Sequence, residues 1–147
     1  KELAESYKPG DTDLVWTRTT RWRALLASAL DQVADQTVSR AHLVGDVGSS
    51  SILLLGAWLT RVLGCEITAE YDASAKGLIS ISLETPEGAV AIERPDGFNA
   101  TIKQPGQPDH VLALPSRTLG DVLAEELRRL DDDPVYGEAL AFYAETH

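Results

Sequence analysis

Two tryptophans and three arginines lie within eight residues, and this group is the most unusual set of side chains in the sequence. It consists of Trp16, Arg18, Arg21, Trp22 and Arg23. Tryptophan and arginine dominate the hot spots of protein–protein interfaces, because they combine a large contact area with directional hydrogen bonding. An arginine can also stack on an indole ring. The cluster therefore predicts a surface that contacts another macromolecule.

A structural role is the alternative for some of these residues. Trp22 lies on the apolar stripe of a predicted helix, so its indole also fits a buried position, and Arg18 and Arg21 are the better candidates for exposure. Asp11 and Asp13 precede the cluster and complete the set of candidate contact residues. They could form a D-x-D metal pair, but a helix cap and a favourable charge at the helix N-terminus are the favoured interpretation.

A turn rich in glycine and serine, residues 45–51, separates a predicted strand from a predicted helix. Small residues there let an anion approach the backbone N–H groups at the helix N-terminus. The candidate anion-binding residues are Gly45, Gly48, Ser49, Ser50 and Ser51. Their spacing matches neither G-x-G-x-x-G nor a P-loop, and serine is also an ordinary helix cap. Anion binding and simple capping both stay open.

Residues that could perform catalysis do not form a recognisable pattern. His42, His110 and His147 are isolated, and the sequence has no HxH, HExxH or G-x-S-x-G motif. Cys65 is the one cysteine, so an internal disulfide or a cysteine cluster for a metal cannot form. It follows a predicted helix C-terminus, whose dipole disfavours a reactive thiolate. We expect no catalytic residues, no metal and no cofactor.

The overall charge excludes further classes of function. The chain has 147 residues, a formal net charge of −10 and a pI near 4.6. A strongly acidic chain is a poor ligand for nucleic acid or for an anionic membrane surface. The longest apolar stretch, residues 52–59, is too short to span a bilayer. The single cysteine favours a cytoplasmic location, and the absence of methionine suggests a piece of a longer protein.

Apolar periodicity and turn signals predict an α+β fold that forms one domain over residues 1–147. The expected helices are 21–34, with a break between Trp16 and Trp22, 52–63, 119–130 and 134–143; the expected strands are 38–44, 66–71, 79–83, 89–93, 98–103 and 110–114. The first two strands and the helix between them suggest a βαβ unit, and the last four form an antiparallel meander. The sheet is thus mixed and mostly antiparallel, with five to six strands.

Details at the chain ends complete this expectation. Gly64 is placed as the left-handed residue that ends helix 52–63. Ser116 or Thr118 caps the next helix. The expected inward stripe of that helix consists of Leu119, Val122, Leu123, Leu127 and Leu130. The buried side of the last helix is expected to contain Tyr136, Ala139, Leu140 and Tyr143.

The sequence resembles the actinobacterial OpcA family in several segments, in the same order and with similar spacing. The matching segments are residues 7–18 (YKPGDTDLVWTR), 22–26 (WRALL), 31–32 (DQ), 57–59 (AWL), 94–96 (RPD) and 123–131 (LAEELRRLD). The first segment is specific, because a generic helix start does not contain it. The resemblance is to the C-terminal half of OpcA proteins, which are about twice as long.

The resemblance implies a non-catalytic partner of glucose-6-phosphate dehydrogenase, the first enzyme of the oxidative pentose phosphate pathway. Such a partner supports assembly or allosteric activation of that enzyme. The family has no catalytic residues to transfer, so the candidate contacts named above rest on physical grounds alone. The alternative is a small-molecule sensor that holds a sugar phosphate or a nucleotide at residues 45–51. An enzyme in its own right is the third possibility. The oligomeric state cannot be inferred.

Overall fold

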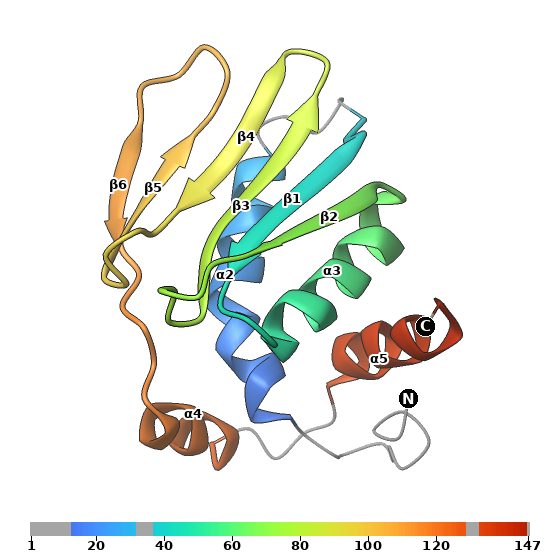
Figure 1. The fold of residues 1–147 in the computed structure, drawn as a ribbon, viewed down its shortest axis with the longest axis vertical. Helices are drawn as coiled ribbons and strands as arrows, with labels where there is room; N and C mark the ends of the chain where they lie inside the picture. Colours follow the sequence, from blue (N-terminus) through green and yellow to red (C-terminus); the bar gives the residue numbers. More distant parts are fainter. Residues whose placement is uncertain (1–12, 32–36, 129–132, 147) are drawn as a thin grey trace.

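A computed structural model describes residues 13–31, 37–128 and 133–146 (Figure 1). In chain order the elements are α2 (Leu14–Asp31), β1 (Arg40–Gly45), α3 (Ser50–Leu63), β2 (Glu66–Tyr71), β3 (Leu78–Thr85), β4 (Gly88–Glu93), β5 (Asn99–Lys103), β6 (His110–Ala113), α4 (Leu119–Glu126) and α5 (Pro134–Thr146). Within these ranges the fold is α+β, as the sequence predicts. No helix in them combines the length and the apolar character that crossing a bilayer requires.

The strands form one mixed sheet in the order β2-β1-β3-β4-β5-β6. The β1 and β2 strands are parallel and are connected through α3, which confirms the expected βαβ unit. From β3 to β6 each strand pairs antiparallel with the next, which confirms the meander. Because β1 also pairs antiparallel with β3, the βαβ unit and the meander share one continuous sheet.

The main core lies between the sheet and helices α2 and α3. Trp22 and Leu26 of α2 and Leu55 of α3 pack there against Leu43 and Ile81 of the sheet. Alternation along each strand produces this arrangement, since successive side chains point to opposite faces. In β3, for example, Ile81 and Leu83 are buried while Ser80 and Ser82 are half-buried.

A second buried cluster joins α2, α3 and α5. It contains Trp16, Leu54, Tyr136, Ala139 and Leu140. Figure 1 shows α5 beside α3, away from the sheet, and α4 near the N-terminal end of α2. Three of the four residues expected on the buried side of α5 are buried, and Tyr143 is half-buried.

The helix ends follow local capping rules. Gly64 adopts the left-handed conformation with φ 64°, and its N–H donates to the carbonyl of Thr60 at 2.8 Å, as expected for this residue. Thr118 caps α4: its side chain accepts from the N–H of Asp121, and the Asp121 carboxylate accepts in return from the Thr118 backbone. The reciprocal bonds fix where α4 begins.

The expected break between Trp16 and Trp22 is wrong, because α2 is continuous from Leu14 to Asp31. The threonines that motivated the break are accommodated by hydrogen bonds along the helix. Thr17 Oγ1 donates to the Asp13 carbonyl at 3.2 Å, and Thr19 Oγ1 donates to the Trp16 carbonyl at 2.7 Å. Such bonds, together with burial of both threonines, outweigh their weak helix propensity.

The inward stripe expected on α4 is also wrong in part. Val122 is fully buried, but Leu119, Leu123 and Leu127 are 53%, 43% and 75% exposed. Val122 is the buried side chain of α4, and polar contacts hold the helix on α2, so its leucine side faces away from the described part of the chain. Leu130 lies outside the described residues. An apolar helix face that the described residues leave uncovered is thus a feature of this fold.

Candidate functional site

The aspartates and aromatic residues at the start of α2 and α5 bind each other reciprocally. Asp13 accepts from the Val15 N–H at 2.7 Å and from the Tyr136 hydroxyl at 3.4 Å. Asp133 accepts from the Tyr136 N–H at 3.0 Å and from the Trp16 indole N–H at 2.9 Å. Each carboxylate therefore caps its own helix and holds an aromatic side chain. We call these four residues, Asp13, Trp16, Asp133 and Tyr136, the reciprocal clamp.

The expectation that Trp16 and Trp22 belong to a contact surface is wrong, because both side chains are buried. The Trp16 side chain is 2% exposed and lies 5.7 Å from the Tyr136 ring, and Trp22 is 3% exposed. Neither indole is presented at the surface, because each fills a core between α2 and its neighbours. Asp13 acts as a cap, which was the favoured alternative, and Asp11 lies outside the described residues.

The three arginines of the cluster have different surroundings. The Arg23 guanidinium lies 3.8 Å over the Trp16 ring and donates to Thr19 Oγ1 and Thr20 Oγ1, both at 3.2 Å. Arg23 therefore covers the clamp. Arg18 and Arg21 are exposed, as the sequence suggested. Among the described residues neither makes an ion pair within 4 Å, so both remain available for contact.

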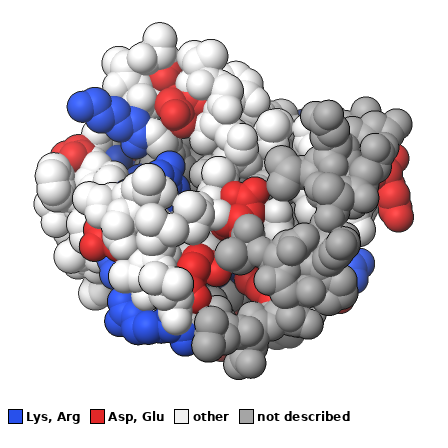
Figure 2. All heavy atoms as spheres, turned by 90° about the horizontal axis from the view of Figure 1, so that it is seen from below, with Lys and Arg blue, Asp and Glu red and all other residues white. Residues whose placement is uncertain are grey.

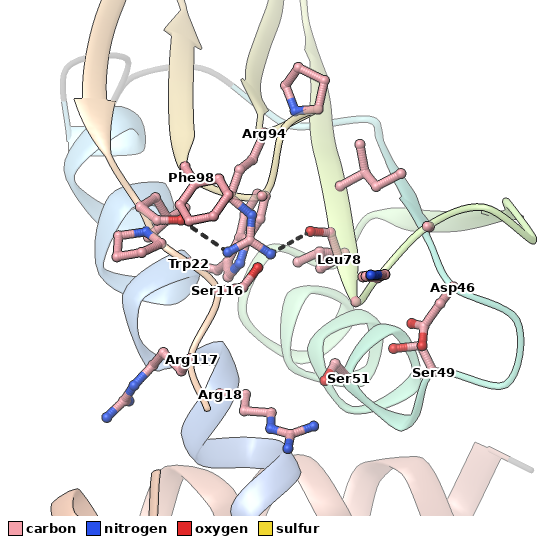
Figure 3. Close-up of a pocket in the computed structure, with 18 of the residues that line it drawn as sticks. Arg18, Trp22, Asp46, Ser49, Ser51, Leu78, Arg94, Phe98, Ser116 and Arg117 are labelled. Carbon is pink, nitrogen blue, oxygen red and sulfur yellow. Dashed lines mark hydrogen bonds between the residues drawn. The ribbon is translucent and has the colours of Figure 1, made fainter. Parts of the chain in front are cut away.

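The turn between β1 and α3 approaches the β2–β3 connection closely. A Cβ atom added to Gly45 would lie 2.8 Å from the Gly77 carbonyl oxygen, which explains the need for glycine there. Gly48 has a φ of 76°. Ser49 is the N-cap of α3, but its side chain makes no capping hydrogen bond. The Asp46 carboxylate lies beside it (Figure 3). Anion binding by this turn, Ser50 included, stays a prediction.

The surface of the described residues contains an open cavity of about 840 Å³. It lies where α2, the β1–α3 turn, the β2–β3 connection, the start of β3 and the segments after β4 and β6 meet (Figure 3). Arg18, Arg21 and Trp22 line one wall, and Ser49 and Ser51 line another. The arginine cluster and the serine turn, which are separate in the sequence, thus meet at one cavity.

Charged side chains of both signs line this cavity, with an excess of basic ones. The basic residues are Arg18, Arg21, Lys76, Arg94 and Arg117, and the acidic ones are Asp46, Asp72 and Asp96. The chain as a whole carries a net charge of −10, so a local positive excess is notable. Figure 2 shows basic side chains in separate groups with acidic ones between them, rather than one uniformly basic face.

Arg94 occupies the inner part of the cavity and is only 7% exposed. Its two terminal nitrogens donate to the carbonyls of Leu114 at 3.1 Å and Leu78 at 2.8 Å, and its guanidinium lies 5.1 Å from the Trp22 ring. Burial lowers the pKa of Arg94, and the nearby Asp96 carboxylate partly offsets this effect. Arginine nevertheless stays protonated in proteins. The cavity therefore contains a buried positive charge.

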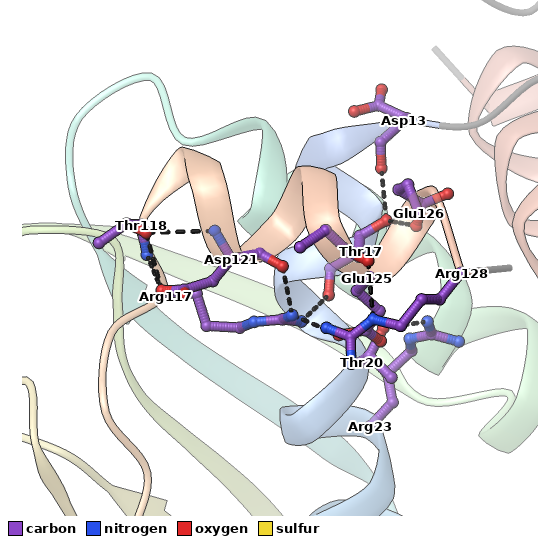
Figure 4. A network of polar contacts seen from close by, with 11 residues as sticks. Asp13, Thr17, Thr20, Arg23, Arg117, Thr118, Asp121, Glu125, Glu126 and Arg128 are labelled. Carbon is purple, nitrogen blue, oxygen red and sulfur yellow. Dashed lines mark hydrogen bonds and ion pairs between the residues drawn. The ribbon is translucent and has the colours of Figure 1, made fainter.

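Polar contacts hold α4 against α2 at the edge of this cavity (Figure 4). Arg117 forms an ion pair with Glu125 and donates to the carbonyls of Thr17 at 3.5 Å and Asp121 at 3.2 Å. The Thr17 hydroxyl shares its single proton between the Asp13 carbonyl and the Glu126 carboxylate. Hydrogen bonds from Thr118 lower the pKa of Asp121, with smaller effects from Arg117 and Arg21. This network fixes α4 beside the exposed arginines of α2.

Histidine and cysteine form no assembled site in the described part of the chain. His42 contacts Thr68 Oγ1 at 2.9 Å and the Glu70 carboxylate at 3.4 Å, at a position with 40% side-chain exposure. His110 is exposed on β6, and His147 lies outside the described residues. Burial raises the pKa of the Cys65 thiol, so its thiolate is disfavoured. Within the described residues no three His, Cys, Asp or Glu side chains are grouped to hold a metal.

The fold and the site define an α+β domain with an open cavity that is rich in basic side chains. A sequence model of one family, described as the C-terminal domain of a glucose-6-phosphate dehydrogenase subunit, matches residues 9–140. The chain belongs to this family, known as OpcA, as its sequence motifs indicated. No curated protein and no solved structure matches the chain.

Proposed function

We propose that this chain is a non-catalytic partner of glucose-6-phosphate dehydrogenase and supports the assembly or the allosteric activation of that enzyme. The observation that carries the proposal is the family match over residues 9–140, whose description names a subunit of the dehydrogenase. The proposal places the chain in the oxidative pentose phosphate pathway, in the cytoplasm.

The contact surface that we propose combines two neighbouring features. The first consists of Arg18 and Arg21 on α2, which are exposed and make no ion pair within the described residues. The second is the exposed leucine face of α4, with residues at intervals of four that share one side of the helix. Arg117 links the helices that carry the two features, because it donates to the carbonyl of Thr17 on α2 and to that of Asp121 on α4. Apolar area with adjacent arginine is typical of interface hot spots.

Regulation also requires that this contact differ in affinity between two states of the enzyme. A partner that binds two states of an enzyme with equal affinity shifts neither of them. Activation therefore requires tighter binding to the active conformation, whereas assembly requires tighter binding to the complete oligomer. The two roles predict different readouts: a change in kcat or KM at constant oligomeric state, or a change in oligomeric state that precedes activity.

Charge reversal on α2 tests the proposed surface. We expect Arg18→Glu with Arg21→Glu to raise the Kd for the dehydrogenase at least about tenfold, because hot-spot arginines typically contribute more than about 1.4 kcal/mol each. The control is Arg40→Glu with Arg61→Glu, which makes the same change of charge at two other exposed arginines, each paired with a glutamate. Circular dichroism checks that both variants fold.

The comparison of the two variants decides the result. A larger loss of binding for the α2 variant supports this surface. An equal loss of binding would mean that only the overall charge matters. No loss of binding in either variant would show that Arg18 and Arg21 do not belong to the interface. Leu123→Asp tests the second feature independently, since this leucine is exposed and its replacement leaves the core intact.

A further inference from the structure

Two buried side-chain atoms lack a hydrogen-bond partner among the described residues, and both belong to residues that line the cavity of about 840 Å³. They are Nε of Arg94 and Oδ1 of Asp46. Buried polar groups in native proteins are nearly always paired, so an exception asks for an explanation. One atom is a donor and the other an acceptor, and they belong to different segments. A ligand that satisfied both would need an acceptor group and a donor group.

Arg94 also lacks a carboxylate partner. Arg94 forms no ion pair within 4 Å among the described residues, although the residue is only 7% exposed. Its two hydrogen bonds go to neutral carbonyls of Leu78 and Leu114. Asp96 offsets part of the cost of this buried charge without forming an ion pair, and an anion in the cavity would offset more of it. A bound phosphate group would suit the planar guanidinium.

The same cavity contains other basic residues. Lys76 on the β2–β3 connection makes no ion pair among the described residues, and neither does Arg18 on α2. Asp72 and Asp96 are engaged in their own turns: Asp72 accepts from Ser74 N–H at 2.7 Å, and Asp96 accepts from Phe98 N–H at 2.8 Å. These two acids thus do not neutralise those basic groups directly.

The cavity has room for more than an inorganic ion. Its volume falls in the range of small-molecule sites, about 300–1,000 Å³. Phe98 at its edge is 68% exposed, and Pro95 and Pro115 add apolar wall. In Figure 3 Asp46 and Ser49 lie on the side of α3, away from Arg94. An anion and a hydroxyl donor at opposite ends of one molecule would match this distribution.

We propose that this cavity binds a small phosphorylated polyol, with its phosphate group at Arg94 and Lys76 and a hydroxyl group donating to Asp46. The inference goes beyond the proposed partner of the chain and does not rest on it. Arg94 is too deeply placed to contact a macromolecular surface directly, so its positive charge is expected to act on a small ligand inside the cavity.

The experiment is a titration of the isotope-labelled chain, without any dehydrogenase, followed by backbone amide chemical shifts. The probes are ribose 5-phosphate, inorganic phosphate and unphosphorylated ribose at constant ionic strength. We expect ribose 5-phosphate to shift amides near Ile79, Gly97 and Ser116 most, inorganic phosphate to shift them less, and ribose to shift them least. No saturable shift with either phosphate probe up to about 20 mM would overturn the proposal.

Two variants separate binding from folding. Arg94→Gln should raise the Kd for ribose 5-phosphate at least about tenfold, which corresponds to about 1.4 kcal/mol, because a charge-assisted hydrogen bond is lost. Because Arg94 also bridges two carbonyls, this variant could lose structure; Lys76→Glu makes no such demand, and we expect at least threefold weaker binding, as about one charged contact is lost. Arg40→Glu is the matched control outside the cavity, and equal weakening by it would overturn the assignment.

The outcome is distinguishable from failure of the proposed function. The titration contains only the chain and the probe, so its result does not depend on the dehydrogenase. If the chain alone shows no shifts but Lys76→Glu weakens capture of the enzyme, the cavity receives a carboxylate of the partner instead, and the small-molecule proposal is wrong.

Discussion

The reciprocal clamp gives the sharpest prediction about stability, and Asp133→Ala is the change that tests it. This substitution removes the cap of α5 and the acceptor of the Trp16 indole N–H, 2.9 Å away. Loss of an aspartate cap costs about 1 kcal/mol. An indole N–H left unpaired at a 2% exposed side chain costs a further 1–3 kcal/mol, roughly. We therefore expect the free energy of unfolding to fall by about 2–4 kcal/mol.

Chemical denaturation followed by tryptophan fluorescence measures this change, and the melting temperature should fall by about 5–15 °C for a domain of this size. Asp133→Ser is the informative second variant, because serine can cap α5 but is too short to reach Trp16. Thr118→Ala is the control, since it removes a cap from α4 without a bond to another helix. The clamp would be refuted if Asp133→Ala were no more destabilising than Thr118→Ala.

Three further predictions concern single positions. Val122→Ala should lower the free energy of unfolding by about 1–2 kcal/mol, whereas Leu123→Ala should change it by less than about 0.5 kcal/mol, because only the first side chain is buried; denaturant titration compares them. The Cys65 thiol should resist a thiol reagent at pH 8 in the folded chain and react after unfolding, since burial raises its pKa; a rapid reaction of the folded chain would contradict this. Hydrogen bonds from Asn99 and Phe98 lower the pKa of Asp96. The ionised carboxylate should therefore stabilise the fold at neutral pH, and this contribution should disappear as the pH falls below about 4 through the lowered pKa. The difference in the free energy of unfolding between the chain and Asp96→Asn should shrink over the same pH range.

The order and type of the elements follow from the sequence because each rests on local signals. Alternation predicts strands such as β3, and residues with special backbone conformations, such as Gly64, mark the ends of helices. The βαβ unit followed by a meander also follows from element order. The insertion of β1 between β2 and β3 does not, since strand pairing depends on contacts across the sheet.

The errors arise where tertiary contacts decide the outcome. The periodicity of α4 shows that it has an apolar stripe, but not whether anything within the chain covers that stripe. For α2, hydrogen bonds and burial of Thr17 and Thr19 outweigh a propensity that predicts a break. The tryptophans are ambiguous for the same reason: composition identifies them as strong contact residues without telling a core from an interface.

The cavity is only partly visible in the sequence. Arg18 and Arg21 and the serine turn stand out by composition, but no sequence signal indicates that they meet. Arg94 is recognisable only within an Arg-Pro-Asp run, and its environment comes from carbonyls of Leu78 and Leu114, 16 and 20 residues away. The burial of its charge without an ion pair among the described residues is therefore a property of the fold.

Binding to the dehydrogenase is the central claim, and a direct titration tests it most simply. The chain is added to purified glucose-6-phosphate dehydrogenase from the same organism, while sedimentation reports the complex and a coupled assay reports kcat and KM. We predict a saturable complex of defined stoichiometry, with a change in activity or in oligomeric state that follows the fraction bound. Two proteins that sediment independently, with unchanged activity, would contradict the claim.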